Sequence, residues 1–226
     1  MLKHNHLSPR AFALTVGITI LFMAAGGGFS YGFVLNSILI PNDATATFAK
    51  LQSAPMLFRA GILSFLGVIM CDILCAWGLY HLLRGANEAL AQLAAWFRVA
   101  FAAAFAALLS FLVSVLPLSQ NASHAVQIHQ LLTTFNNAWS LALVLFGIHL
   151  LLVGYIVATS GEVPKILGFL AMFAALCYIG TSVAALVIPQ YALYKPSVEA
   201  VLSLPMALGE LSLGLWYLLK GGKAKK

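Results

Sequence analysis

The sequence has very little charge. Only 8% of its 226 residues are Asp, Glu, Lys or Arg, whereas soluble domains carry about 25%. Hydrophobic residues make up 62% of the chain. So few charged side chains cannot cover the surface of a water-soluble domain. The composition therefore predicts an integral membrane protein.

Cysteine is also scarce, and its positions exclude an extracellular disulfide framework. Cys71, Cys75 and Cys177 all lie inside apolar segments. The spacing of Cys71 and Cys75, one helical turn, is compatible with metal binding, but small residues packed on a helix explain it better. The sequence indicates no dedicated metal site and no particular cofactor.

Long apolar segments dominate what is present. A helix needs about 20 apolar residues to cross a membrane. Six segments meet this requirement: residues 11–40, 57–84, 88–116, 131–158, 166–188 and 200–220. We expect an all-α bundle of six transmembrane helices that forms a single domain over residues 1–226. The first segment is far longer than the apolar part of a cleaved signal peptide, about 7–15 residues, so we expect it to be retained.

Two local patterns refine this expectation. Residues 42–56 are too polar to span, and Asp43 is a good helix N-cap. They predict a short interfacial helix on the outer face. Ala24, Gly28 and Gly32 form a small-xxx-small stripe, which favours close helix packing.

The basic residues lie mostly on one side of the predicted membrane. With both termini in the cytoplasm, only Lys50 and Lys195 lie outside. Eight basic residues lie inside: Lys3, Arg10, Arg84, Lys165, Lys220, Lys223, Lys225 and Lys226. This bias follows the positive-inside rule and predicts a cell (inner) membrane protein with cytoplasmic termini. Because topology explains the net charge of +6 and no nucleic-acid-reading motif is present, we expect a lipid bilayer and no nucleic acid as partner.

Four ionisable residues interrupt the apolar segments at a similar depth. Asp72, Arg98, His149 and Glu210 each lie 10 to 12 residues from the predicted cytoplasmic ends. At about 1.5 Å per residue, these positions are about 15–18 Å deep, near the middle of a hydrocarbon core of about 30 Å. A charge there costs at least about 2.5–3.5 kcal/mol, so such groups need partners. The sequence predicts that the four residues meet in one layer.

The charges in this layer do not balance. Arg98 pairs with one acid, and the second acid is then protonated or bonded to His149. Ser203 and Tyr217 share the helix face of Glu210 at seven-residue steps and are secondary candidates for the site. Arg59, another secondary candidate, lies nearer a span end, where long basic side chains reach the interface.

Four stretches together carry a family resemblance: LFRAG (57–61), CDILCAWGLYHLLRGANEALAQLAAWFR (71–98), FGIHLLLVGYIVATSGEVPKILG (146–168) and GELSLGLWYLLKG (209–221). They resemble a family of uncharacterised multi-pass bacterial membrane proteins, domain of unknown function 4386. The resemblance covers nearly the whole chain after residue 10, and it implies that Arg59, Asp72, Arg98, His149 and Glu210 are characteristic residues. It implies no activity. The chain departs from the family pattern after Tyr178, where Gly180-Thr181-Ser182 replaces an expected acid.

Three functions remain compatible with the sequence. The first is binding or transport of a small molecule or ion, with Arg98 holding an anion and Asp72 or Glu210 exchanging protons; it predicts a water-accessible polar cavity. The second is an intramembrane hydrolase, with His149, Asp72 and Glu210 as metal ligands, although no HExxH or GxSxG motif is present. The third is an accessory or assembly protein whose charges are structural. Six helices are few for a transporter, so a homodimer is also compatible.

Overall fold

The computed structural model describes residues 8–223, apart from the side chains of Ala192 and Glu199. Lys3, Lys225 and Lys226, which were counted for the predicted topology, lie outside the described residues. Over the described range every regular element is a helix. The elements are α1 (Pro9–Gly27), the π-helix η1 (Gly28–Leu35), α2 (Asn36–Ile38), α3 (Ala44–Ser53), α4 (Pro55–Leu83), α5 (Glu88–Leu118), the 3₁₀-helix η2 (Ala122–His124), α6 (Ala125–Ser160), α7 (Lys165–Val187) and α8 (Tyr191–Leu219).

Six helical segments are long and apolar enough to cross a membrane. They are Pro9–Ile38, Pro55–Leu83, Glu88–Leu118, Ala122–Ser160, Lys165–Val187 and Ala200–Leu219. The predicted six-helix fold is therefore confirmed. The bounds differ most at the last helix, because α8 begins at Tyr191 rather than at residue 200. The predicted segment began later because Pro196 and the polar residues near it lower the hydropathy of these first turns.

The helix starts follow local sequence signals. Ser8 caps α1 by accepting a hydrogen bond from the amide of Ala11 at 3.2 Å. The predicted short helix is α3, and Asp43 caps it by accepting from the amide of Ala46 at 2.8 Å. At the end of α6, Gly161 has a φ of +71°, a backbone conformation that glycine adopts without a steric penalty.

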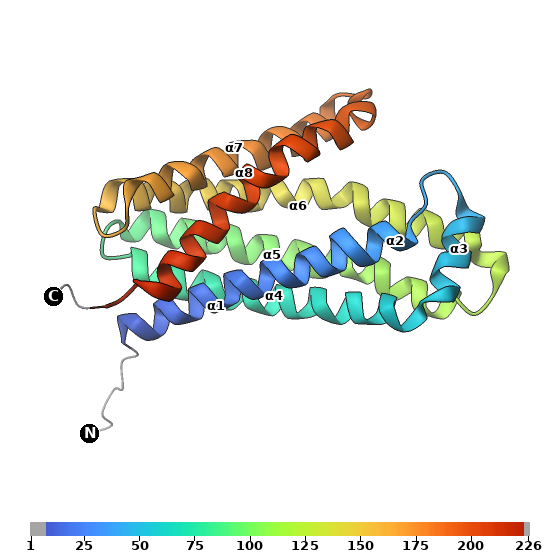
Figure 1. Cartoon of the computed structure of the whole chain (residues 1–226), viewed down its shortest axis with the longest axis horizontal. Coiled ribbons are helices and arrows are strands. Elements are labelled where there is room, and N and C mark those ends of the chain that lie inside the picture. Colours follow the sequence, from blue (N-terminus) through green and yellow to red (C-terminus); the bar gives the residue numbers. More distant parts are fainter. Residues whose placement is uncertain (1–7, 224–226) are drawn as a thin grey trace, which may run out of the picture.

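The six long helices form a closed ring. Each helix packs against the next along the chain, in the order α1, α4, α5, α6, α7 and α8, and α8 returns to pack against α1. Figure 1 shows the start of α1 and the end of α8 at one end of the bundle and α3 at the other. We call these the terminal end and the α3 end. Toward the α3 end, the turn between α7 and α8 diverges from the other helices (Figure 1).

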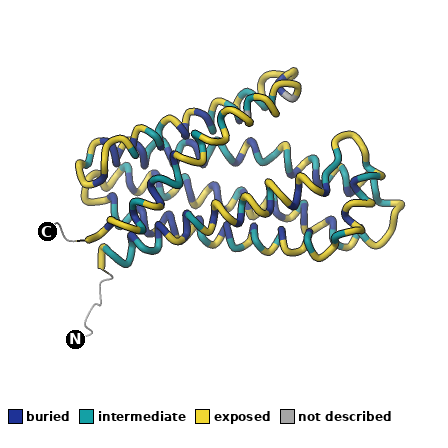
Figure 2. Tube along the Cα trace, viewed as in Figure 1, coloured by how far each residue is buried: buried dark blue, intermediate teal, exposed yellow. Residues whose placement is uncertain are grey.

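Large apolar side chains cover the outside of the ring. Leu63, Trp96 and Phe169 are each more than half exposed, and exposed residues recur along every long helix (Figure 2). An apolar outer surface of this kind suits a lipid environment.

Glycines set the closest helix contacts. A Cβ atom on Gly168 of α7 would lie 2.6 Å from both the amide nitrogen of Ala158 and the carbonyl oxygen of Gly154 on α6. These helices therefore pack backbone to backbone. The predicted stripe of Ala24, Gly28 and Gly32 was wrong as a packing signal, because all three are exposed and no atom lies within 4 Å of a Cβ built on either glycine.

The first span changes its winding in the middle. Residues Gly28–Leu35 form a π-helix between α1 and α2. Within it, the Ser30 hydroxyl donates to the carbonyl oxygen of Gly61 on α4 at 2.9 Å. π-helical turns are rare and often occur at functional sites. Here Gly28 and Tyr31 of this segment each line a cavity.

Candidate functional site

Arg98 is at the centre of the predicted polar layer. Its side chain projects from α5 and is 2% exposed. Ala94 and Ala102, one helical turn to either side, are also buried. These small residues leave room for the guanidinium group on the face that packs against the neighbouring helices.

Asp72 of α4 is the first partner of Arg98. The Arg98 Nε atom donates to Asp72 Oδ1 at 3.0 Å, and Arg98 Nη2 lies 2.9 Å from the same oxygen. The Asp72 side chain is 2% exposed. The second oxygen, Asp72 Oδ2, is buried and has no hydrogen-bond partner in the part of the chain that the structure describes.

Glu210 of α8 is the second acidic partner. Arg98 Nη2 donates to Glu210 Oε1 at 3.0 Å. The Glu210 side chain is 19% exposed, against 2% for Asp72. Of the two acids, Glu210 is therefore the one that reaches open space.

His149 of α6 completes the cluster, and its contacts define its tautomer. Its Nδ1 lies 2.8 Å from the carbonyl oxygen of Ala94, which can only accept, so Nδ1 carries the hydrogen. Its Nε2 lies 3.0 Å from Arg98 Nη1, and it accepts from that group. The ring is therefore neutral in this arrangement.

The predicted meeting of Asp72, Arg98, His149 and Glu210 is confirmed as geometry. We call these residues the charge cluster. When ionised, it contains one positive and two negative groups, so it has one excess negative charge. All three nitrogens of the Arg98 guanidinium have partners within the protein. An additional contact, from Arg98 Nη2 to the sulfur of Met23 at 3.3 Å, comes from α1.

A cavity of about 340 Å³ adjoins the charge cluster. We call it the central cavity. Asp72, Arg98 and Glu210 form its polar wall, and Gly27 and Gly28 contribute open backbone from the first span. Half of the remaining lining residues are aromatic: Phe65, Phe101, Phe105, Trp139, Phe146 and Tyr178. The Phe146 ring lies over the Arg98 guanidinium, with its centroid 5.3 Å from Cζ.

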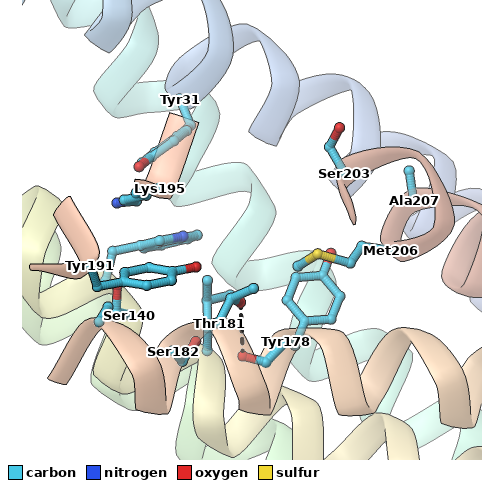
Figure 3. A pocket seen from close by; sticks show the side chains of 13 residues that line it. Tyr31, Ser140, Tyr178, Thr181, Ser182, Tyr191, Lys195, Ser203, Met206 and Ala207 are labelled. Atoms are coloured by element: carbon cyan, nitrogen blue, oxygen red, sulfur yellow. Dashed lines mark hydrogen bonds between the residues drawn. The ribbon is translucent and has the colours of Figure 1, made fainter. Parts of the chain in front are cut away.

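A second void, which we call the side pocket, lies next to the central cavity. It has a volume of about 270 Å³, and the two voids share Trp139, Leu143, Tyr178 and Ala207. Figure 3 shows side chains from η1, α7 and α8 around it, with Tyr31, Tyr191 and Lys195 on one side and Tyr178 and Met206 on the other. Its serine and threonine side chains come from α6, α7 and α8: Ser140, Thr181, Ser182 and Ser203.

The secondary candidates lie apart from the charge cluster. Ser203 lines the side pocket, and together with Ala207 and Glu210 it follows one face of α8. Tyr217 is buried near the terminal end, and its hydroxyl has no hydrogen-bond partner among the described residues. Arg59 is exposed and lies beside Gln52 of α3, away from the cluster.

The aromatic wall was not predicted from the sequence. Phe101 and Phe105 follow Arg98 at spacings of three and seven residues, and Phe146 precedes His149 by three. These spacings place each ring on the helix face of a cluster residue, so the signal was present. Met23 had no such signal, because its place in the cluster depends on how α1 packs in the ring.

The contacts of His149 argue against the metal-dependent hydrolase. Both ring nitrogens already have partners, and the positive charge of Arg98 lies between the acids. Among the described residues, no group of three or more His, Cys, Asp and Glu side chains is arranged to hold a metal ion.

Comparisons with known proteins agree with this architecture. Residues 15–221 match the family described as a domain of unknown function (DUF4386). The chain is 31% identical over 156 residues to an uncharacterized protein of Archaeoglobus fulgidus, a match that covers 69% of this chain and 80% of that protein. No solved structure matches the chain. The chain therefore belongs to the family defined by this domain of unknown function.

Proposed function

We propose that the protein binds a small molecule or ion in the central cavity and that the charge cluster exchanges a proton when it does so. The excess negative charge of the cluster, at the wall of the central cavity, carries this proposal. An uncompensated charge at mid-membrane depth costs at least about 2.5–3.5 kcal/mol. A proton held by the acid pair removes that cost in the empty state.

The two acids have different roles in this proposal. Asp72 is buried, and one of its oxygens lies within 3.0 Å of two Arg98 nitrogens, so it mainly holds the arginine in place. Glu210 makes one contact with Arg98 Nη2 and has the more exposed side chain. The proton belongs to the coupled pair, and Glu210 is the member that passes it to the cavity.

Arg98 was first expected to hold an anion, and here it has a different role. A guanidinium whose three nitrogens all contact protein groups has little capacity left for an external anion. Arg98 instead fixes the positions of Asp72, His149 and Glu210. A purely structural cluster would not need the second acid, because one carboxylate is enough to neutralise one arginine.

The orientation of the bundle follows from its basic residues. The terminal end holds Arg10, Arg84, Lys165, Lys220 and Lys223, and the α3 end holds Lys50, Arg59 and Lys195. Under the positive-inside rule, the terminal end faces the cytoplasm. In intact cells, a membrane-impermeant thiol reagent should label Lys50→Cys but not Lys165→Cys in a cysteine-free background. The opposite pattern would reverse the orientation.

Infrared spectroscopy of the protein in lipid nanodiscs tests the charge balance. Near neutral pH, the wild-type protein should show the C=O band of one protonated carboxyl group, and this band should shift quickly in D₂O because the group borders the cavity. Glu210→Gln and Asp72→Asn should each remove the band, because one acid then balances Arg98. Arg98→Gln should strengthen it. A wild-type protein without the band would contradict the proposal.

A further inference from the structure

The central cavity has the wall chemistry of a site for an organic cation. Its charged wall holds the one excess negative charge of the cluster. Among the described residues of that wall, Arg98 is the one cationic group. It already contacts Asp72, Glu210 and His149. His149 is neutral because its Nε2 accepts from Arg98. An anion would therefore meet carboxylates in the cavity without a free cationic group to bind it.

The rest of the wall favours a positive charge as well. The faces of aromatic rings carry negative potential and attract cations, and aromatic cages bind quaternary ammonium groups in this way. Phe146 already contacts the Arg98 cation at 5.3 Å. The Tyr178 ring packs edge-on against Phe146 with centroids 5.1 Å apart, and the Trp139 ring packs edge-on against Phe105 at 4.5 Å. The aromatic wall thus continues from the arginine toward the side pocket.

The size of the cavity favours an organic cation over a metal ion. A volume of about 340 Å³ is within the usual range for small-molecule sites, about 300–1,000 Å³, and far exceeds what one metal ion fills. The wall is mainly hydrocarbon, and the described residues offer no group of three metal-binding side chains. A cation with an apolar body fits both the acid and the rings.

We propose that the ligand of the central cavity is a lipophilic organic cation, which takes the place of the proton beside Glu210. This inference rests on the proposed function and specifies its ligand. The exchange balances in charge, because one cation enters and one proton leaves. The cluster is neutral with its proton in the empty site, and the cluster together with the bound cation is neutral in the occupied site.

The groups that face Glu210 from neighbouring helices do not change this balance. They are Asp72 and Cys75 of α4, Arg98 of α5, His149 of α6 and Tyr178 of α7. Met23 of α1 carries no charge. Lys195 is on α8 itself, fifteen residues away and therefore about 22 Å along the helix, and it lines the side pocket rather than the central cavity.

A matched pair of probes tests the inference. Phenyltrimethylammonium and tert-butylbenzene have the same shape, and only the first is charged. We expect the cation to raise the melting temperature of the purified wild-type protein and to bind at least tenfold more tightly than the neutral probe. Because one proton is displaced, the apparent affinity of the cation should rise about tenfold per pH unit while the acid pair holds its proton.

Three variants locate the binding. Glu210→Gln should lower the affinity for the cation at least tenfold and leave the affinity for the neutral probe unchanged. Gly28→Leu places a side chain into the central cavity and should abolish binding of the cation. Gly32→Leu is the matched control, because it lies one turn further along η1, has open space around a Cβ and lines neither void. It should bind like the wild type.

The outcomes separate the two proposals. If both probes bind equally and Gly28→Leu blocks both, the cavity binds small molecules without selecting for charge. That result overturns the inference and leaves the proposed binding function standing. If Gly28→Leu changes the binding of neither probe, the central cavity is not a binding site, and both proposals are wrong.

Discussion

At the scale of single residues, Arg98 determines the arrangement of the polar layer. It contacts Asp72, His149 and Glu210 from three other helices. Removing one member of a buried ion pair usually costs about 3–5 kcal/mol, because the partner charge is left uncompensated. We expect the two acids of this cluster to contribute unequally to the free energy of unfolding.

Thermal unfolding of three variants tests this difference. Arg98→Gln should lower the free energy of unfolding by about 3–5 kcal/mol, because two acids then face each other without a cation. Glu210→Gln should be close to neutral or stabilising, because Asp72 still neutralises Arg98. Arg59→Gln is the control: it removes an exposed arginine, and surface changes usually stay within about 0.5 kcal/mol. Equal losses for Arg98→Gln and Arg59→Gln would show that the cluster does not hold the bundle together.

The shared depth of the four ionisable residues could be predicted from the sequence because helix rise is constant. Counting from the span ends placed Asp72, Arg98, His149 and Glu210 in one layer, and the structure confirms their contacts. The hydrogen bond from His149 to the Ala94 carbonyl could not be predicted in the same way. It depends on the rotation of α6 against α5, which the mixed small and large residues around His149 leave open.

At the scale of helices, contact geometry depends on a few glycines that look alike in the sequence. Gly28 and Gly32 have the spacing of a packing stripe, yet a Cβ on either would meet open space. Gly154 and Gly168, fourteen residues apart on different helices, meet in a backbone-to-backbone contact. A one-dimensional pattern shows which residues share a face, but not which face meets a neighbour.

Two alanine substitutions on α7 separate packing from helix propensity. Gly168→Ala should lower the free energy of unfolding by about 1–3 kcal/mol, the usual cost of overpacking, because its Cβ would lie 2.6 Å from backbone atoms of α6. Gly180→Ala on the same helix has open space and should raise it by up to about 1 kcal/mol, because alanine favours helices over glycine. Thermal melts in one detergent would measure both, and a stable Gly168→Ala protein would refute the close contact.

At the scale of the whole molecule, the closing contact between α8 and α1 turns six helices into a ring. Arg10 of α1 contributes to that closure by donating to the carbonyl oxygens of Tyr217 at 3.2 Å, Leu218 at 2.6 Å and Gly221 at 2.8 Å. A cation at these carbonyls also suits the negative end of the helix dipole. The sequence carries no signal for this contact between the two ends of the chain. The homodimer stays a prediction.

Both proposals depend on a cavity in the ring that has a charged wall and that water can reach beside Glu210. Two cysteines on α8 test it directly, in a protein in which Cys71, Cys75 and Cys177 have been replaced by alanine. Ala207 lines both voids, whereas Leu204, three residues earlier, is 66% exposed on the outside of the ring.

In lipid nanodiscs, a charged methanethiosulfonate reagent reacts only with thiols that water can reach. We expect the reagent to label Ala207→Cys and to leave Leu204→Cys, which faces lipid, unlabelled. Labelling of Leu204→Cys alone, or of neither position, would show that the core beside Glu210 is closed to water and would contradict the proposed binding site.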